Sequence, residues 1–218
     1  MRISKIYEKY KIPPSLQMHM FRVAAVAWTI CENIEQKTDV DNIIAAELLH
    51  DIGNIIKFNF EVYPELYQPE GVEYWKSVQV EFRTKYGNDE HRAVKLIIDE
   101  IGVTDRIKEL VEVVGALKTM PILELHDVSK WVANYADYRV SPFGIVSLKE
   151  RLEDGRKRYV LNKGPVNFSM EFALEIEKNA KILEKRISRN CKIDLNSIND
   201  KLVSDKINLL QDFEISTK

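Results

Sequence analysis

Cysteine, glycine and proline are scarce in this 218-residue sequence, and long hydrophobic runs are missing. The two cysteines, Cys31 and Cys191, lie far apart and match no CxxC or other thiolate pattern of a metal site, so we expect a reducing, cytoplasmic setting. Eight glycines and seven prolines are too few for a turn-rich β architecture. No apolar stretch approaches the roughly 18 residues of a membrane span, so we expect no membrane partner.

The sequence also has no excess of charge of one sign. Its 32 lysines and arginines face 34 aspartates and glutamates, which gives a formal net charge of -2. Because no basic surplus attracts polyanions, we expect neither long nucleic acids nor anionic membranes as partners. Hydrophobic residues make up 45% of the chain, enough for one sizeable core.

Apolar residues recur at helical spacing along most of the chain and predict an all-α fold. An aromatic-rich stretch at 58–75 interrupts this pattern and is typical of an insertion or lid, and the charged segment 149–163 predicts a turn. Alternating β-branched residues, which would indicate strands, do not occur. The predicted helices span residues 16–36, 39–58, 72–86, 89–102, 104–117, 123–140, 168–188 and 195–213.

The dipeptide His50-Asp51 lies within the predicted second helix, where it shares a polar stripe with two neighbours. At about 100° per residue, Glu47 and Asn54 project from the same side as His50, and leucines and isoleucines occupy the opposite side. Taken alone, such a stripe fits a helix face exposed to solvent.

Two further polar residues stand out because their neighbours are apolar. His19 shares a face of the first predicted helix with Val23 and Val26, and Arg22 is its one polar neighbour there. Asp137 follows alanines on a helix, where a carboxylate is costly to bury unless it is paired or binds a cation. Each signal alone also fits an ordinary core residue.

In chain order, His19, His50-Asp51 and Asp137 resemble the motif of the HD superfamily of metal-dependent phosphohydrolases, named for its His-Asp pair. The resemblance implies an HD-domain-like helical bundle in a single domain, 1–218, and a divalent metal ion bound by these four residues. It also places Asp51 between the metal and the attacking water. It covers residues 16–144, ahead of a C-terminal helical extension at 145–218, and rests on MHMFRVA at 18–24, ELLHDIG at 47–53 and YADYRV at 135–140.

A second His-Asp pair, His126-Asp127, provides an internal control. Using it as the motif would require His91 upstream and an acid such as Asp154 downstream, but Asp154 lies in the charged segment that predicts a turn. On one predicted helix, His126 and Asp137 would be about 16 Å apart and could not share an ion. We therefore expect His126 to lie outside the metal site.

Two imidazoles and two carboxylates are too hard a set for copper(I) and lack the thiolates of structural zinc, which leaves manganese, iron, cobalt, nickel, magnesium or zinc. Some two-metal branches of the superfamily have a histidine at a point comparable to His91 and another in the next helix, where residues 110–117 contain none. The resemblance therefore favours one metal ion. His91 begins a helix whose dipole favours a neutral imidazole, so we predict a catalytic pocket residue; an exposed surface histidine is the alternative.

The residues that neutralise the substrate phosphate are less well defined. Many relatives read HDIGK, whereas this chain has the uncharged Asn54 in place of the lysine. We predict that Asn54 binds substrate and that the positive charge comes from Lys57, Arg22 or Arg139, although each also fits an ordinary ion pair. Glu47 could orient a ligand or serve as a catalytic acid or base.

These features predict hydrolysis of a phosphoester by a metal-activated water. The resemblance implies a small phosphorylated substrate, a nucleotide as the leading candidate, and a homodimer is compatible with it. The aromatic stretch 58–75 and the basic residues at 151–158 could form a lid and a phosphate-steering rim, although packing would also account for the aromatics. The alternatives are a noncatalytic metal- and nucleotide-binding regulatory module and, disfavoured by the few histidines, a metal-dependent oxygenase.

Overall fold

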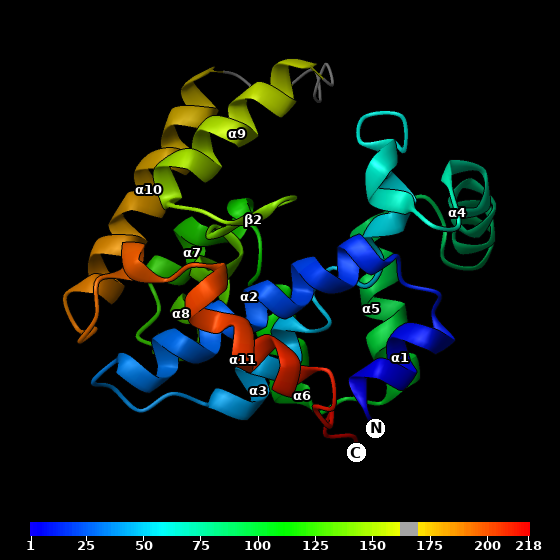
Figure 1. Ribbon diagram of the computed structural model, residues 1–218. Helices are drawn as coiled ribbons and strands as arrows, with labels where there is room; N and C mark the ends of the chain where they lie inside the picture. Colours follow the sequence, from blue (N-terminus) through cyan, green and yellow to red (C-terminus); the bar gives the residue numbers. More distant parts are fainter. Residues whose placement is uncertain (162–169) are drawn as a thin grey trace.

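The computed structural model describes residues 1–161 and 170–218, with side chains for 1–157 and 170–218. The described residues confirm the all-α prediction, with one small β-hairpin added, and none of their helices is both long and apolar enough to cross a membrane. The elements, shown in Figure 1, are α1 (Ile3–Lys9), α2 (Pro14–Asn33), α3 (Val40–Glu47), η1 (Asn54–Lys57), η2 (Pro64–Tyr67), α4 (Val72–Tyr86), α5 (Glu90–Ile101), α6 (Asp105–Glu112), η3 (Ala116–Lys118), α7 (Thr119–Leu123), α8 (Val128–Asp137), β1 (Val140–Ser141), β2 (Gly144–Ile145), α9 (Leu148–Leu161), α10 (Met170–Ser188), η4 (Leu195–Ser197) and α11 (Asp200–Leu210).

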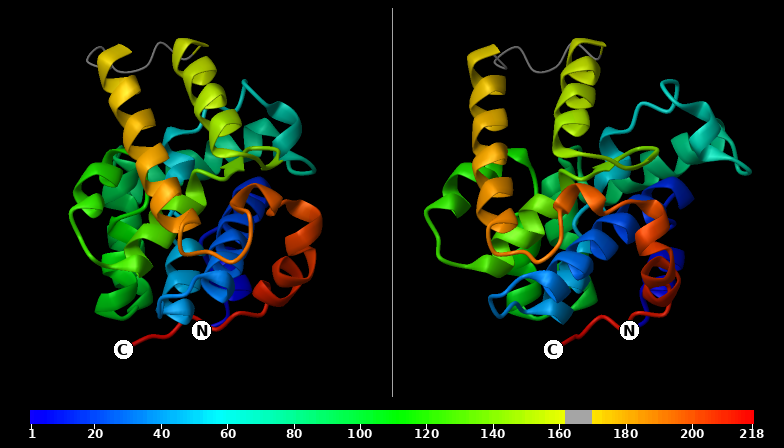
Figure 2. Two further views of the ribbon diagram at one scale, coloured as in Figure 1. Left: turned by 90° about the vertical axis from the view of Figure 1, so that its left-hand side faces the viewer. Right: turned by 60° about the vertical axis from the view of Figure 1, so that its left-hand side comes forward.

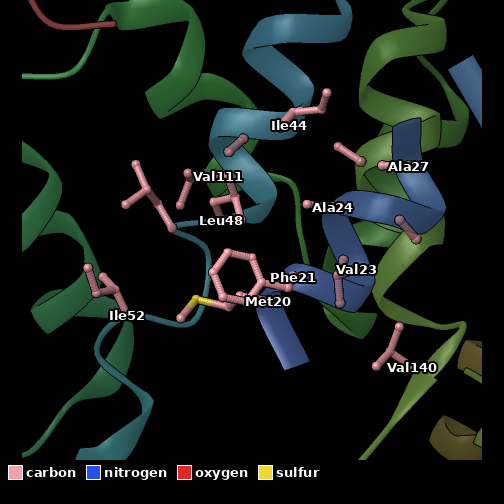
Figure 3. Packing of buried hydrophobic residues seen from close by; sticks show 14 of the residues in the cluster. Met20, Phe21, Val23, Ala24, Ala27, Ile44, Leu48, Ile52, Val111 and Val140 are labelled. Atoms are coloured by element: carbon pink, nitrogen blue, oxygen red, sulfur yellow. The ribbon is translucent and has the colours of Figure 1, made fainter. Parts of the chain in front are cut away.

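Helix α2 is the centre of the bundle. Its residues from Val23 to Ala27 are inaccessible to solvent, which requires neighbours on every side. Helices α3, α8 and α11 supply them, and Figure 3 shows Leu48, which follows α3, next to Phe21 and Met20 of α2. Because α2 is fixed on all sides, its second turn holds His19 at a defined position in the bundle.

The predicted second helix ends eleven residues earlier than expected, at Glu47 rather than at residue 58. Two acceptors that a continuing helix would need are already in use. The Glu47 carbonyl contacts His50 Nδ1 at 2.8 Å, and the Leu48 carbonyl accepts a hydrogen bond from the hydroxyl of Tyr7 at 2.7 Å. The chain therefore passes through tight turns at 48–53 before η1, and the helical stripe predicted for His50 and its neighbours does not form.

Helices α9 and α10 lie side by side and project from the rest of the bundle (Figure 2). The turn predicted at 149–163 is wrong for its described part, because residues 149–161 belong to α9. A capping box starts this helix: the Ser147 hydroxyl accepts from the Glu150 N–H (3.2 Å), and the Glu150 carboxylate accepts from the Ser147 N–H (2.8 Å). The side chain of Arg158 and the predicted start of the next helix at residue 168 lie outside the described residues.

The remaining differences concern where helices stop. The predicted helix 104–117 ends at Glu112, and the helix 195–213 is reduced to η4 and α11. Within the predicted helix 123–140 only Val128–Asp137 forms a helix, α8; α7 ends at Leu123, and Asp127 caps the start of α8 by accepting from the Lys130 N–H. His126 is an exposed loop residue between them, so the helical-rise argument that separated it from Asp137 does not apply. Helix α1, which supplies Tyr7, was not predicted from the charged N-terminal sequence.

Candidate metal centre

The four residues predicted to bind metal converge from three parts of the bundle. His19 comes from α2, His50 and Asp51 from the turns after α3, and Asp137 is the last residue of α8. His19 Nε2 is 3.6 Å from Asp51 Oδ2 and 3.3 Å from Asp137 Oδ1. His50 Nε2 is 3.6 Å from Asp51 Oδ1 and 3.8 Å from Asp137 Oδ1. Two imidazole nitrogens and two carboxylates thus face a common point.

The turn after α3 orients His50 toward this point. Its Nδ1 lies 2.8 Å from the Glu47 carbonyl, so the proton belongs on Nδ1 and the lone pair on Nε2. His50 Nε2 is buried and has no hydrogen-bond partner among the described residues. An unprotonated imidazole nitrogen that faces two carboxylates across a space of this size is what a divalent cation requires. One ligand atom each from His19, His50 and Asp51 lie within 4.8 Å of one another, which also fits a shared ion.

The pKa shifts of the partly exposed Asp137 and the fully buried Glu47 have opposite directions. Burial alone would raise the pKa of Asp137, but the hydrogen bond with His19 and the charges of His50, His19 and Arg151 hold that pKa well below its usual range. For Glu47, burial raises the pKa well above its usual value, and the charges of Asp137 and Asp51 add to this effect. Asp137 is therefore ready to bind a cation as a carboxylate, whereas Glu47 favours its protonated form.

A cavity of about 1670 Å³ opens over the four residues. One wall is the aromatic-rich segment after η1, which contributes Phe58, Tyr63 and Tyr67. Tyr63 also contacts Phe143 of the hairpin turn edge to face, with ring centroids 5.1 Å apart. An apolar wall comes from residues between the end of α6 and the loop after α7; it consists of Val111, Val113, Val114, Ala116, Pro121, Ile122 and Leu125. The cavity therefore combines a polar floor with apolar and aromatic walls, as small-molecule sites do.

Besides Asp51, three of the predicted substrate or catalytic residues line this cavity. Asn54 is nearly buried in η1, at 7% exposure. Lys57 follows one turn later and forms an ion pair with Glu90 at 3.4 Å. His91 is exposed on the wall made by α5.

The other three, Arg139, Arg22 and Glu47, do not line the cavity, and each has partners elsewhere in the fold. Arg139 is buried, and its guanidinium donates to the carbonyls of Val146, Leu195 and Ile198. Arg22 is held by Asp200 of α11 at 2.6 Å. Glu47 is fully buried behind His50, with its Oε2 3.6 Å from His50 Nδ1, a position from which it can orient that ligand but does not face the cavity.

Arg151 is a cavity residue that the sequence-based predictions did not single out from the basic segment 151–158. It was missed because weak apolar periodicity predicted a turn where α9 forms. The Ser147-x-x-Glu150 pattern was the signal that could have revealed the helix.

Comparison with known proteins gives one result. The family model of the HD domain matches residues 17–161 of the chain. No curated protein and no solved structure matches it significantly.

Proposed function

The chain belongs to the HD-domain family, and on that basis we propose that it is a metal-dependent phosphohydrolase that cleaves a phosphoester of a small nucleotide-like substrate. The observation that supports this proposal best is the convergence of His19, His50, Asp51 and Asp137 at the floor of a large cavity. These four residues would hold one divalent ion, chosen from manganese, iron, cobalt, nickel, magnesium or zinc. Such an ion lowers the pKa of a bound water and neutralises charge on a phosphoryl group.

The protein's own residues prepare the site for this chemistry. The Glu47 carbonyl fixes His50 in the tautomer whose Nε2 faces the carboxylates. Asp51 is more accessible than His50, the other residue of the His-Asp pair. We propose that one carboxylate oxygen of Asp51 binds the ion and that the other accepts a hydrogen bond from the attacking water. Glu47 acts from behind His50 as a positioning residue.

The cavity walls suggest how the rest of a substrate is bound. Asn54 can donate a hydrogen bond to a phosphoryl oxygen without adding charge, and Lys57 and His91 can meet a phosphate from the α5 side. We propose that the aromatic rings of Phe58, Tyr63 and Tyr67 contact the organic part, for which a nucleobase is a suitable flat ligand. A cavity this size holds more than an isolated phosphate.

The proposal is tested by removing metal from the purified protein with a chelator and reloading it with manganese, cobalt or nickel. Release of phosphate is then measured with nucleoside monophosphates and small phosphate esters. We expect activity that requires metal and is lost in Asp51→Asn, with His126→Ala as the matched His-Asp control that keeps it. Absence of turnover with every metal and substrate, or an Asp51→Asn variant as active as the wild type, would contradict the proposal.

A noncatalytic metal- and nucleotide-binding module is the second candidate. The uncharged Asn54 at the cavity floor favours it, because less positive charge is available there to stabilise a transition state. Such a module would bind metal and nucleoside monophosphates in the same experiment but release no phosphate.

A further inference from the structure

Arg151 of α9 is a cation next to the metal centre that the fold holds in place. Two contacts fix the start of α9 close to the end of α8. Arg139, two residues after Asp137, donates to the Val146 carbonyl at 2.6 Å, and its own carbonyl accepts from the Val146 N–H at 2.8 Å. The capping box of Ser147 then begins the helix, so Arg151 reaches the cavity from an anchored position.

The guanidinium of Arg151 has hydrogen-bonding capacity left for a ligand. Its Nη1 lies 3.6 Å from Asp154 Oδ2, which is longer than a hydrogen bond. Its Nε is buried and makes no hydrogen bond within the described part of the chain. The side chain is 20% exposed and lines the same cavity as the four candidate ligands, and its charge acts directly on Asp137. An unsatisfied buried N–H is costly, which makes a ligand partner there favourable.

Two lysines that line the cavity lie near acids: Lys57 Nζ is 3.4 Å from Glu90, and Lys130 Nζ is 3.8 Å from Glu109. Arg151 differs from both because its buried Nε has no hydrogen-bond partner in the described part of the chain. A count of charge shows why another cation is needed. Two carboxylates cancel a divalent ion, so a bound phosphate dianion would remain without a full counter-charge at the centre. A guanidinium can supply that charge together with a planar pair of N–H donors matched to two phosphoryl oxygens.

We propose that Arg151 binds the nonbridging oxygens of the substrate's phosphoryl group, as the cation that complements the metal centre; this inference rests on the proposed function. Its binding role is separate from that of the four ligands, so metal binding does not depend on it. The chain also offers a matched control on the same helix. Arg156 pairs with Glu177 of α10 at 2.7 Å and does not line the cavity.

The experiment measures binding of inorganic phosphate to the manganese-loaded protein by calorimetry, together with metal content, for the wild type, Arg151→Met, Arg151→Lys and Arg156→Met. We expect Arg151→Met to keep its metal and to bind phosphate about tenfold or more weakly, because a charge-assisted pair is lost. Arg151→Lys should recover part of the affinity, and Arg156→Met should bind as the wild type does. Unchanged phosphate affinity in Arg151→Met, or loss of its metal, would overturn the proposal.

Phosphate binding keeps this test separate from catalysis. If the wild type binds phosphate but hydrolyses no ester, the proposed function fails while the comparison of variants still decides the role of Arg151. If the wild type takes up no metal, the same titration is made on the metal-free protein. Equal phosphate affinity in wild type and Arg151→Met, or no binding in either, then overturns the role given to Arg151.

Discussion

Replacing Gly53 with alanine tests whether the turn that carries His50 and Asp51 depends on close contact with α5. The backbone of Gly53 has φ -95° and ψ -4°, which alanine also adopts, so any cost comes from space alone. An added Cβ would lie 2.8 Å from the Glu90 carbonyl oxygen, 2.9 Å from the Val94 nitrogen and 2.9 Å from the Ala93 Cβ. Two of these atoms are backbone, which cannot rotate away.

To regain ordinary contact of at least 3.4 Å, the turn and α5 must separate by about 0.5 Å. Overpacking of this kind costs about 1–3 kcal/mol, or about 2–12 °C in Tm for a chain of this length. Because the shift reaches Asp51, we also expect weaker metal binding.

Urea denaturation measures the stability and calorimetry with manganese the affinity. Gly155→Ala is the control: it lies in α9 with open space around its Cβ position and should be neutral or stabilising by about 0.5–1 kcal/mol. A Gly53→Ala protein within 0.5 kcal/mol of the wild type in free energy of unfolding, with unchanged metal affinity, would refute this reasoning.

Three further substitutions test other parts of the account. Arg139→Met should destabilise the fold by about 3–5 kcal/mol in urea denaturation, since it removes the donor of three carbonyls, two of them buried; a stable variant with only a raised KM would favour the predicted substrate role. Burial raises the pKa of Glu47, and the charges of Asp137 and Asp51 add to the effect. Above pH 4.5 the folded metal-free protein therefore keeps a proton on Glu47 that the unfolded chain releases. The free energy of unfolding consequently falls as the pH rises above 4.5. Glu47→Gln removes this loss, and its stability advantage over the wild type should grow between about pH 5 and pH 8 in urea titrations; a constant difference would contradict the assignment. His126→Ala should retain the metal content of the wild type in elemental analysis, because His126 is exposed in the loop before α8; loss of metal would place it at the site.

The four candidate ligands could be found from the sequence because the motif is defined by the order of its residues along the chain, which does not depend on the fold. The sequence could not show how His50 and Asp51 are presented. Leu48, Leu49 and Ile52 continue the helical periodicity, and the helix stops because Tyr7, 41 residues away, takes the Leu48 carbonyl. Local periodicity contains no information about such a tertiary competitor.

The arginines illustrate the same limit for the candidate site. Arg139 stands next to the motif, but its partners are carbonyls at 146, 195 and 198, and only the packed C-terminal segment brings two of them there. Arg151 was placed in a turn because its helix has little apolar periodicity, although the capping box at Ser147 was readable. The partners of Arg139 depend on tertiary contacts that the sequence does not show, whereas the position of Arg151 depends on a cap that it does show.

The number of metal ions bound per chain shows whether His19, His50, Asp51 and Asp137 form one metal centre. Native mass spectrometry of the chelator-treated protein after reloading with manganese or cobalt gives the number of ions per chain. We expect one ion per chain in the wild type, retained in His126→Ala and lost in His50→Ala, because His50 Nε2 faces both carboxylates. A wild-type chain that takes up no ion, or a His50→Ala chain that binds it as tightly as the wild type, would contradict the account.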